Sequence, residues 1–429
     1  MTHKEKAVKT LAEICRLIVG AVFVFSGFVK AVDPMGFEIK IAEYLSAWGA
    51  EGFRTLSGLA AFNLIAVEFT LGVAMLLGVY RRYTSLLSLG LMALMTPLTL
   101  YLAIFNPVTD CGCFGDAIVI SNWETFFKNV VLLAAAWFVY AHHSSILPFF
   151  STRVRWFVPL FAYTSALFFS YWNYSHLPMI DFRPYKAGVN IPSQMSIPQG
   201  APEDEYRYSF VYEKDGRRET FTLDDYPAGD SAWTFVESRT ELVKKGYTPP
   251  IAAFNIFDAE GNDVAEQILA YGGDAFLLIA ADIDYASDKR AGDISSLYDY
   301  ARQHGIPFYC ITGSSAESVD GWTARTGAEY PFLSADETLL KTIIRSNPGL
   351  VWLGDGGTIR QKWHYNDMPE EEEIDRLLSD DAGQADVNRL RKAWMRTDIY
   401  AFILPLLLVW AYDFMRFRRR KRLPQQSGD

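Results

Sequence analysis

The chain has 429 residues, of which 50% are hydrophobic and 21% charged, and its 40 basic and 50 acidic residues give a net charge of −10. This composition excludes a disordered chain, a collagen-like chain and a disulfide-rich miniprotein. Residues 176–395 hold 37 acidic and 21 basic residues, whereas the other 209 residues hold 13 and 19. An acidic, water-exposed domain is therefore joined to an apolar, mildly basic remainder. No nucleic-acid partner is expected, because such binding needs a basic stripe.

The apolar remainder contains segments long enough to cross a bilayer, which takes about 20 mostly apolar residues per helix. Six windows reach that length, over residues 11–32, 57–79, 83–105, 121–143, 157–176 and 397–417. If the six helices alternate in direction, every basic short loop falls on one side, which the positive-inside rule makes cytoplasmic. We therefore expect a multi-pass protein of the bacterial inner membrane, with both termini cytoplasmic and residues 176–395 outside. The lipid bilayer is its first expected partner.

The predicted fold class is a multi-pass helical membrane bundle of six spans with an extracytoplasmic α/β domain. The predicted units are a four-helix membrane domain, a fifth span, a linker with a small β-rich segment, an α/β domain, a second linker, a sixth span and a basic cytoplasmic tail. They cover, in that order, residues 1–145, 146–176, 177–245, 246–378, 379–396, 397–417 and 418–429.

The acidic segment alternates strand-like and helix-like patterns. Alternating apolar residues over 206–212 and 218–223, on either side of Lys214-Asp215-Gly216, predict a hairpin. Beyond residue 246, strands are predicted over 252–257, 275–281, 308–312, 350–353 and 358–363, and helices over 294–304, 319–326 and 338–345. This order predicts an α/β layer with a mixed sheet.

Residues 246–368 resemble the thioredoxin-like fold in its TlpA or peroxiredoxin-like form, through "PPIAAFNIFDAEGNDV" and "SNPGLVWLGDGGTIRQKW". The resemblance implies that Pro348 is the cis-proline that faces the family's redox site. The family's Cys-x-x-Cys position is occupied by residues 282–287, which read DIDYAS and contain no cysteine. Because dithiol exchange needs a thiolate, this domain is expected to be a binding or structural module. Cys310, in an apolar strand, is expected to be buried and inert.

Cys111 and Cys113 lie in the sequence DCGCFGD, in a loop predicted to be extracytoplasmic, where disulfides persist. A disulfide across one residue closes a tight ring, and strained exposed disulfides are generally the labile ones. A capping box at Ser121-x-x-Glu124 places a helix N-terminus near the loop and favours a thiolate, whereas Asp110 and Asp116 oppose it. A redox pair, a structural disulfide and half of a metal site all remain open. No metal is expected, because the loop contains no histidine.

Residues 16–142 resemble the DoxX and MauE group of four-helix membrane proteins, through "GAVFVFSGFVKAVDPMGF", "AVEFTLGVAMLLGVYRR" and "DCGCFGD". This group is associated with membrane redox chemistry, and MauE with the maturation of disulfide-containing proteins outside the cytoplasm. The resemblance implies a redox role for Cys111 and Cys113, and makes Lys30 and Glu68 the intramembrane polar positions. Glu68 is expected to face the bundle interior, for packing or for a quinone or proton path. Lys30 is expected to snorkel from its helix end.

The resulting hypothesis is a membrane-bound thiol–disulfide redox protein that acts on an extracytoplasmic client through Cys111 and Cys113. A quinone is the candidate cofactor, and no cofactor is certain. The alternative is a non-enzymatic, membrane-anchored assembly or maturation factor whose thioredoxin-like domain binds an envelope protein. The sequence leaves open whether the protein is an enzyme.

Overall fold

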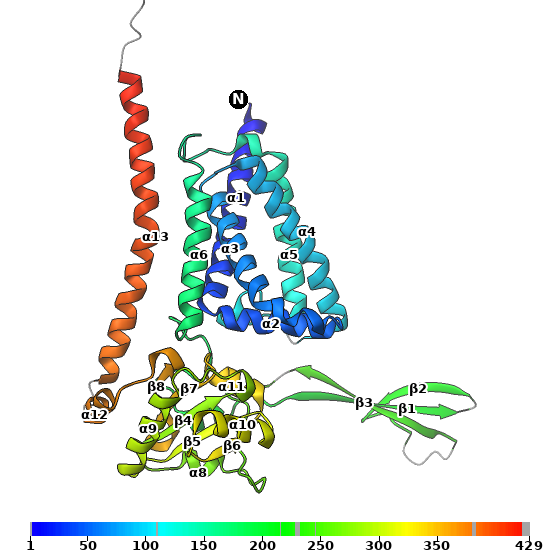
Figure 1. The fold of residues 1–429 in the computed structure, drawn as a ribbon. Helices are drawn as coiled ribbons and strands as arrows, with labels where there is room; N and C mark the ends of the chain where they lie inside the picture. Colours follow the sequence, from blue (N-terminus) through cyan, green and yellow to red (C-terminus); the bar gives the residue numbers. More distant parts are fainter. Residues whose placement is uncertain are drawn as a thin grey trace, which may run out of the picture.

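The computed structural model describes residues 2–108, 110–214, 216–227, 232–244, 246–379 and 383–422. Its N-terminal part is a bundle of long helices standing side by side (Figure 1). The bundle consists of α1 (His3–Val32), α3 (Ser57–Leu76), α4 (Arg81–Phe105), α5 (Asn122–Ala141) and α6 (Phe157–Ser175). Helix α2 (Pro34–Ala47) lies across the end of the bundle opposite the N-terminus (Figure 1). The short 3-10 helices η1 (Glu51–Leu56), η2 (Gly115–Ala117) and η3 (His143–Ser145) lie in the connections.

Among the described helices, five are long and apolar enough to cross a membrane. They are His3–Val32, Glu51–Leu76, Arg81–Phe105, Asn122–Ala141 and Arg396–Arg416. The predicted span over residues 157–176 is outside this group, although its helix α6 packs against α1 and α3. Helix α6 includes polar residues, among them the buried Ser170 and Asn173. Five helices therefore qualify as spans by length and composition, and α6 runs between the two ends of the bundle beside them (Figure 1).

Glycines allow α1 and α3 to approach closely. A Cβ atom on Gly72 of α3 would lie 2.6 Å from the backbone nitrogen of Val24 on α1. A Cβ on Gly27 of α1 would lie 2.8 Å from the backbone nitrogen of Phe69 on α3. Small residues at helix crossings let backbones pack tightly where the bilayer supplies no hydrophobic driving force. This crossing sets the distance between polar side chains that α1 and α3 carry.

A five-stranded mixed sheet forms the centre of the soluble domain, with the order β6-β5-β4-β7-β8. Strands β4, β5 and β6 are parallel to one another, β7 runs antiparallel to β4, and β8 runs antiparallel to β7. The strands are β4 (Ala275–Ala280), β5 (Phe308–Thr312), β6 (Phe332–Ser334), β7 (Gly349–Gly354) and β8 (Thr358–His364). The prediction of a strand over residues 252–257 is wrong. In this segment Phe257 forms two isolated bridges, to Asp263 and Ser334, and the other residues form no strand pairing.

Both faces of this sheet are buried. Leu277 and Ile279 of β4 face one core, and Phe276 and Leu278 face the other. A strand covered on both faces reads as a continuous apolar run, as residues 275–281 do. One core is completed by α8 (Ala265–Leu269) and α11 (Glu337–Ile343), and the other by α9 (Ala291–Gln303), α10 (Ala316–Thr326) and α12 (Glu371–Ser379). The short elements η4 (Ile283–Tyr285), η5 (Asp355–Gly357) and η6 (Tyr365–Asp367) complete this part of the chain.

The segment that leaves the membrane is part of the soluble domain. Tyr185 and Ile191, the latter in α7 (Ile191–Met195), belong to one of the two cores. Asp181 in the same segment accepts a 2.5 Å hydrogen bond from Lys362 of β8 and a 2.9 Å bond from Arg183. These charged side chains are each at most 8% exposed, so they form a buried ionic cluster that fixes the exit segment to the sheet.

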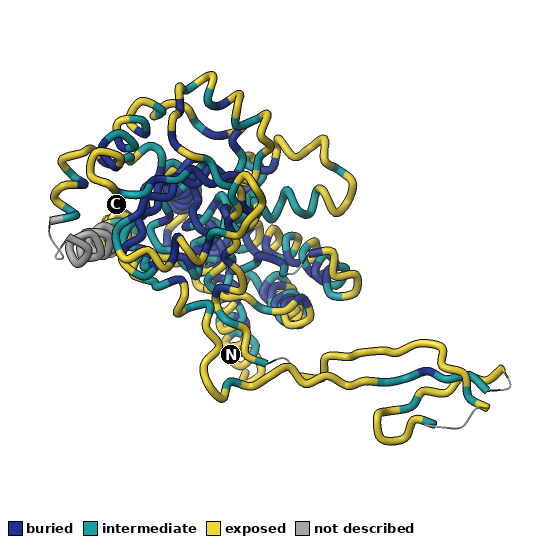
Figure 2. Tube along the Cα trace, turned by 90° about the horizontal axis from the view of Figure 1, so that it is seen from below, coloured by how far each residue is buried: buried dark blue, intermediate teal, exposed yellow. Residues whose placement is uncertain are grey.

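A three-stranded antiparallel sheet projects from the soluble domain and is called the arm below. Most of its residues are exposed or half-buried (Figure 2). The predicted hairpin is confirmed as β1 (Glu205–Lys214) and β2 (Arg217–Thr222), and β3 (Thr234–Lys244) adds a strand that was not predicted. In β1, the aromatic residues Tyr206, Tyr208, Phe210 and Tyr212 alternate along the strand and therefore share one face. Val211 is the buried apolar residue among the described residues of the arm.

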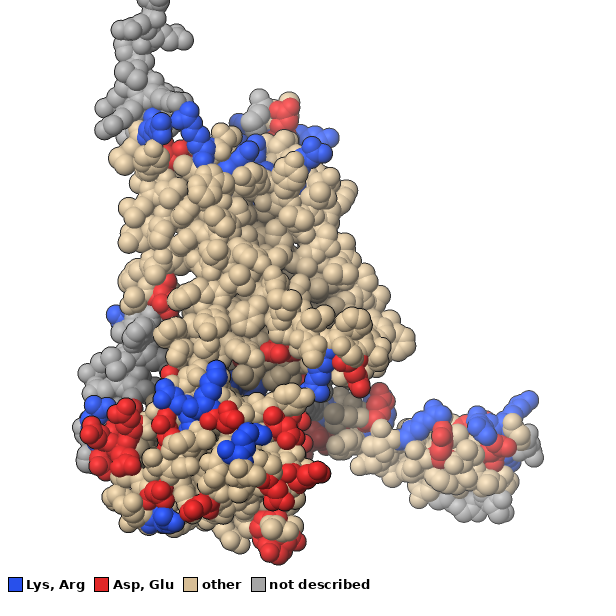
Figure 3. All heavy atoms as spheres, viewed as in Figure 1, with Lys and Arg blue, Asp and Glu red and all other residues tan. Residues whose placement is uncertain are grey.

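The last helix, α13 (Gly383–Arg422), runs beside the bundle toward the end where the N-terminus lies (Figure 1). Phe402 stacks on Phe161 of α6, with ring centroids 5.5 Å apart, and packs edge-on against Phe69 of α3. The carboxylate of Asp413 accepts hydrogen bonds from the backbone and hydroxyl of Ser151. Lys and Arg side chains gather at this end of the bundle, and most acidic side chains lie on the soluble part (Figure 3).

Candidate functional site

The two cysteines of the DCGCFGD sequence meet in the loop between α4 and α5. Their sulfur atoms are 2.8 Å apart, and both are free thiols. Gly112 between them has φ = +65°, a conformation that glycine adopts without steric cost. Cys111 is 8% exposed and Cys113 is half-buried. The loop therefore presents two thiols in hydrogen-bonding contact, within reach of each other for disulfide formation.

Three elements of the bundle hold this loop in place. The hydroxyl of Ser26 on α1 donates a 2.6 Å hydrogen bond to the carbonyl of Cys113. The hydroxyl of Tyr44 on α2 donates a 2.7 Å bond to the carbonyl of Cys111. Lys128 of α5 lies 4.0 Å from the centre of the Phe114 ring. Since both cysteine carbonyls are bonded from separate helices, the positions of the sulfur atoms depend on how those helices pack.

Lys30 and Glu68, the two intramembrane polar candidates, form an ion pair between α1 and α3. The Lys30 ammonium lies 2.7 Å from a carboxylate oxygen of Glu68. Lys30 is 7% exposed and also lies over the Phe37 ring, 4.8 Å from its centre. The expectation that Lys30 snorkels is therefore wrong, because its charge is buried and paired. Pairing is what an ionisable group in an apolar bundle needs.

The charges around the loop make the two thiols unequal. The hydrogen bond that the two sulfur atoms share, together with the positive charges of Lys128 and Lys30, lowers the pKa of Cys113. The same hydrogen bond and burial raise the pKa of Cys111. Near neutral pH the arrangement therefore favours a thiolate at Cys113 and a thiol at Cys111.

The two acidic residues expected to oppose a thiolate each face a cation. Lys40 of α2 lies 3.2 Å from Asp110, and Arg345 of the soluble domain lies 3.2 Å from Asp116. The predicted capping box at Ser121 and Glu124 is present at the start of α5. The sequence left the balance of charge in this loop open, and the structure favours the thiolate because cations from two other elements neutralise the loop carboxylates.

Arg345 is the residue of this region that sequence reasoning missed. Its guanidinium lies 2.8 Å from the carboxylate of Asp33, which follows α1, and also reaches Asp116 in the cysteine loop. The Arg345 side chain is 10% exposed. No local pattern could have revealed these contacts, because Arg345 is more than 200 positions from both partners in the chain.

The segment that follows Arg345 is the turn before β7, and its Asn347–Pro348 peptide bond is cis. The Asn347 side chain donates a 2.6 Å hydrogen bond to the carbonyl of Asp282. Asp282 begins the segment that replaces the Cys-x-x-Cys of thioredoxin-like proteins, in which Tyr285 is 85% exposed. Cys310 lies in β5, is 1% exposed, and has a pKa raised by burial. The cysteine pair of the membrane domain is thus separate from the inert thiol of the sheet.

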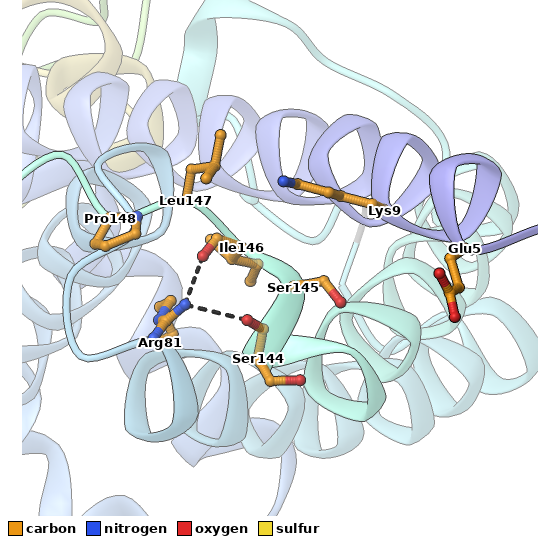
Figure 4. Close-up of a pocket in the computed structure, with 8 residues that line it drawn as sticks. All are labelled: Glu5, Lys9, Arg81, Ser144, Ser145, Ile146, Leu147 and Pro148. Carbon is orange, nitrogen blue, oxygen red and sulfur yellow. Dashed lines mark hydrogen bonds between the residues drawn. The ribbon is translucent and has the colours of Figure 1, made fainter. Parts of the chain in front are cut away.

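Other features of the structure lie away from the thiols. A pocket of about 400 Å³ opens at the opposite end of the bundle (Figure 4). It is lined by Glu5, Lys9, Arg81 and residues 144–148. A second pocket lies on the soluble domain, beside Tyr271 and Tyr309. Within the described ranges, no three His, Cys, Asp or Glu residues are grouped so as to hold a metal ion.

The strand order, the two antiparallel strands at one side of the sheet and the helices on both faces define a thioredoxin-like α/β domain. The whole chain thus combines a multi-pass helical membrane domain with a thioredoxin-like domain. Residues 8–142, which run from within α1 to the end of α5, match the family model of methylamine utilisation protein MauE, so this part of the bundle is similar to a MauE-type membrane domain. Residues 206–245, which form the arm, match a domain of unknown function, DUF8463.

No curated protein matches the chain. One solved chain that matches is a solution structure from Bacteroides thetaiotaomicron described as a protein disulfide isomerase. It is 17% identical, and the match covers 32% of this chain and 86% of that one, with a TM-score of 0.24. The thioredoxin-like assignment rests on the strand topology and not on this match.

Proposed function

We propose that this protein is a membrane-bound thiol–disulfide redox protein whose Cys111 and Cys113 exchange electrons with an extracytoplasmic client. The observation that supports it most is the contact of the two thiols at 2.8 Å, in a loop whose surroundings lower the pKa of one of them. A structural disulfide gains nothing from a difference between the pKa values of its two thiols. A disulfide that closes so short a loop also removes little entropy from the unfolded chain, so it would stabilise the protein little.

In the oxidised protein, a client thiolate attacks the sulfur of Cys111 and breaks the Cys111–Cys113 bond. Cys113 leaves as the thiolate, because the thiol with the lower pKa is the better leaving group. The second client thiol then attacks the client sulfur of the mixed disulfide and releases Cys111. Two electrons and two protons pass from the client to the pair, the client gains one disulfide, and the reverse sequence reduces a client disulfide.

A membrane quinone is the class of oxidant that we propose for regenerating the disulfide, by accepting two electrons and two protons. Lys30 and Glu68 are the residues of the bundle that support this proposal. They lie close enough to Cys113 for their charges to act on its thiol, and their ion pair is a place where a proton can be held inside the bundle.

For the orientation, we propose that the cysteine loop and the soluble domain face the extracytoplasmic side of a bacterial inner membrane, with both termini in the cytoplasm. The support is the gathering of Lys and Arg at the end of the bundle that carries the N-terminus (Figure 3).

The test is a redox titration of the purified protein in lipid nanodiscs, with glutathione buffers and thiol-specific gel shifts. Cys15→Ser serves as the background, and Cys111→Ser and Cys113→Ser as the variants. We expect a reversible two-electron transition that either variant abolishes, and quinone reduction that starts from the dithiol protein. A pair that stays oxidised or stays reduced across the whole buffer range contradicts the proposal.

The alternative is a non-enzymatic anchored maturation factor whose thioredoxin-like domain binds an envelope protein. It is favoured by the absence of cysteine from residues 282–287 and by the exposure of Tyr285. Under this alternative, replacing both Cys111 and Cys113 by Ser leaves the maturation of the bound protein intact in cells. Tyr285→Ala then abolishes it.

A further inference from the structure

We propose that Arg345 of the thioredoxin-like domain is a positioning residue for the cysteine pair of the membrane domain. By bridging Asp33 and Asp116, it couples the docking of the soluble domain to the reactivity of the thiols. The inference rests on the proposed redox function, and it assigns to the cysteine-free thioredoxin-like domain a part in that function.

The first support is where the two carboxylates lie. Asp116 follows Cys113 by three residues in the cysteine loop itself. Asp33 caps the N-terminus of α2, because its carboxylate accepts a 2.8 Å hydrogen bond from the backbone of Gly36. Arg345 therefore contacts one carboxylate in the loop and another at the start of the helix that holds the loop.

The second support is that α2 contacts the loop directly. Tyr44 of α2 donates to the carbonyl of Cys111, and Lys40 of α2 pairs with Asp110. The guanidinium of Arg345 is thus connected to the cysteine loop in two ways. One connection runs through Asp116 and the loop, and the other runs through Asp33 and α2.

The third support is burial. The side chains of Arg345 and Asp33 are 10% and 14% exposed, and Arg345 also donates a 2.5 Å hydrogen bond to the carbonyl of Lys341. Removing one member of a buried ion pair leaves an uncompensated charge, which is far more costly than losing an exposed pair. Breaking the contact between Arg345 and Asp33 is therefore costly, and this contact joins the soluble domain to the bundle.

The electrostatic consequence has a definite sign. Without Arg345, the carboxylate of Asp116 is no longer neutralised, and it lies beside Asp110 in the loop that carries the thiols. Added negative charge disfavours a thiolate, so the pKa of Cys113 rises and the dithiol form loses stability. Other charged or titratable groups near the thiols keep their places, namely Lys30, Lys40, Tyr44, Glu68, Asp110 and Lys128.

The experiment compares Arg345→Gln with Arg345→Lys, with the double variant Arg345→Gln/Asp116→Asn, and with the matched control Arg325→Gln. Arg325 forms a 3.3 Å pair with Asp288 on the surface of the same domain, where both side chains are about half exposed. All variants are full-length, in the Cys15→Ser background and in nanodiscs. The readouts are the pH dependence of Cys113 alkylation by an impermeant maleimide after chemical reduction, and the equilibrium of the pair with glutathione.

We expect Arg345→Gln to move the alkylation midpoint to higher pH. It should also lower the equilibrium constant for reduction of the pair about tenfold, which is about 30 mV for a two-electron couple. Arg345→Lys should keep most of the wild-type behaviour, the double variant should restore the midpoint, and Arg325→Gln should match wild type. A purely structural defect would lower the melting temperature without moving the midpoint.

Two results overturn the proposal: an Arg345→Gln midpoint equal to wild type, or a double variant that remains shifted like Arg345→Gln. If Arg345→Gln does not accumulate in the membrane, Asp116→Asn decides, with a shift to lower pH in support and an unchanged midpoint against. Failure of the redox function looks different. In that case the wild-type pair does not equilibrate with glutathione, whereas the alkylation profile of the reduced protein still reports on Arg345.

Discussion

At the scale of single residues, several buried ionisable groups are held in ion pairs. Lys30 pairs with Glu68 inside the bundle, and Lys362 pairs with Asp181 beneath the sheet. His364 is the exception, because it is 1% exposed and its ring nitrogen Nδ1 accepts a hydrogen bond from the backbone of Asn366. A ring nitrogen that accepts a hydrogen bond carries no proton. The imidazole of His364 is therefore held in its neutral form in the folded state.

The first prediction concerns the pH dependence of stability. Burial and the nearby His176 lower the pKa of His364 to about 4, from an ordinary value of 6.5. Between pH 6.5 and 4 the unfolded chain therefore binds a proton that the folded chain does not. The free energy of unfolding should fall as the pH drops through this range, by up to about 3 kcal/mol from this residue. Above pH 6.5, where His364 is neutral in both the folded and the unfolded chain, this loss of stability is absent.

Thermal unfolding of the full-length protein, followed by tryptophan fluorescence from pH 7.5 to 4, measures this effect. His364→Gln removes the titrating group, so its melting temperature should depend less steeply on pH than that of the wild type. Parallel curves for the two proteins would show that His364 is not the group responsible.

At the scale of elements, the crossing of α1 and α3 controls the site. Helix α1 carries Ser26 and Lys30, and α3 carries Glu68, so the distances at the thiols depend on how closely these helices pack. The glycines at the crossing make that approach possible, since a Cβ on Gly72 would meet the backbone of Val24. Gly90 on α4 has open space around it, so a substitution at Gly90 is the matched control for one at Gly72.

We predict that Gly72→Ala destabilises the bundle by about 1–3 kcal/mol, because α1 must move away from α3. Gly90→Ala should be neutral or slightly stabilising, because alanine is the better helix former and meets no neighbour. Melting temperatures in one detergent measure both variants. The Gly72 variant should also raise the alkylation midpoint of Cys113, as Lys30 moves away. Equal melting temperatures for both variants would contradict this account of the crossing.

Elements were predicted well where the chain is strongly patterned. The strand over 308–312 was predicted with its observed bounds, and the hairpin around Gly216 was found because alternation and turn residues agree. The short strand β6 was missed, because three residues carry too little pattern to identify a strand. The strand predicted over 252–257 is instead a loop, because its apolar residues Phe254 and Ile256 pack into the core without forming a ladder.

At the scale of the whole molecule, the parts of the chain are joined very differently. The thioredoxin-like domain is fixed to the bundle through the buried pair of Arg345 and Asp33, and the exit segment is fixed to the sheet through Asp181. Among the residues of the arm that the structure describes, the ion pairs are exposed and lie within the arm itself. The arm leaves and re-enters the domain at neighbouring points, since the backbone of Gly246 bonds the side chain of Asp204 at 2.7 Å.

We therefore predict that replacing residues 205–245 by a short Gly-Ser connection leaves the stability of the remainder within about 0.5 kcal/mol, because the arm adds almost nothing to either core. The redox titration of the cysteine pair should also be unchanged. Melting and titration of the shortened protein test both expectations. A large loss of stability would mean that the arm packs on the domain more than its exposure indicates.

The sequence by itself determined the apolar bundle, the split in charge and the thiol pair in its glycine-containing loop. Each of these depends on composition or on residues that are neighbours in the chain. Only the tertiary structure decided that Lys30 and Glu68 are partners, that Lys40 and Arg345 neutralise the loop carboxylates, and that the soluble domain contacts the cysteine loop. These contacts join residues tens to hundreds of positions apart, and the helix and strand periodicities that a sequence reveals carry no information about which distant charges meet.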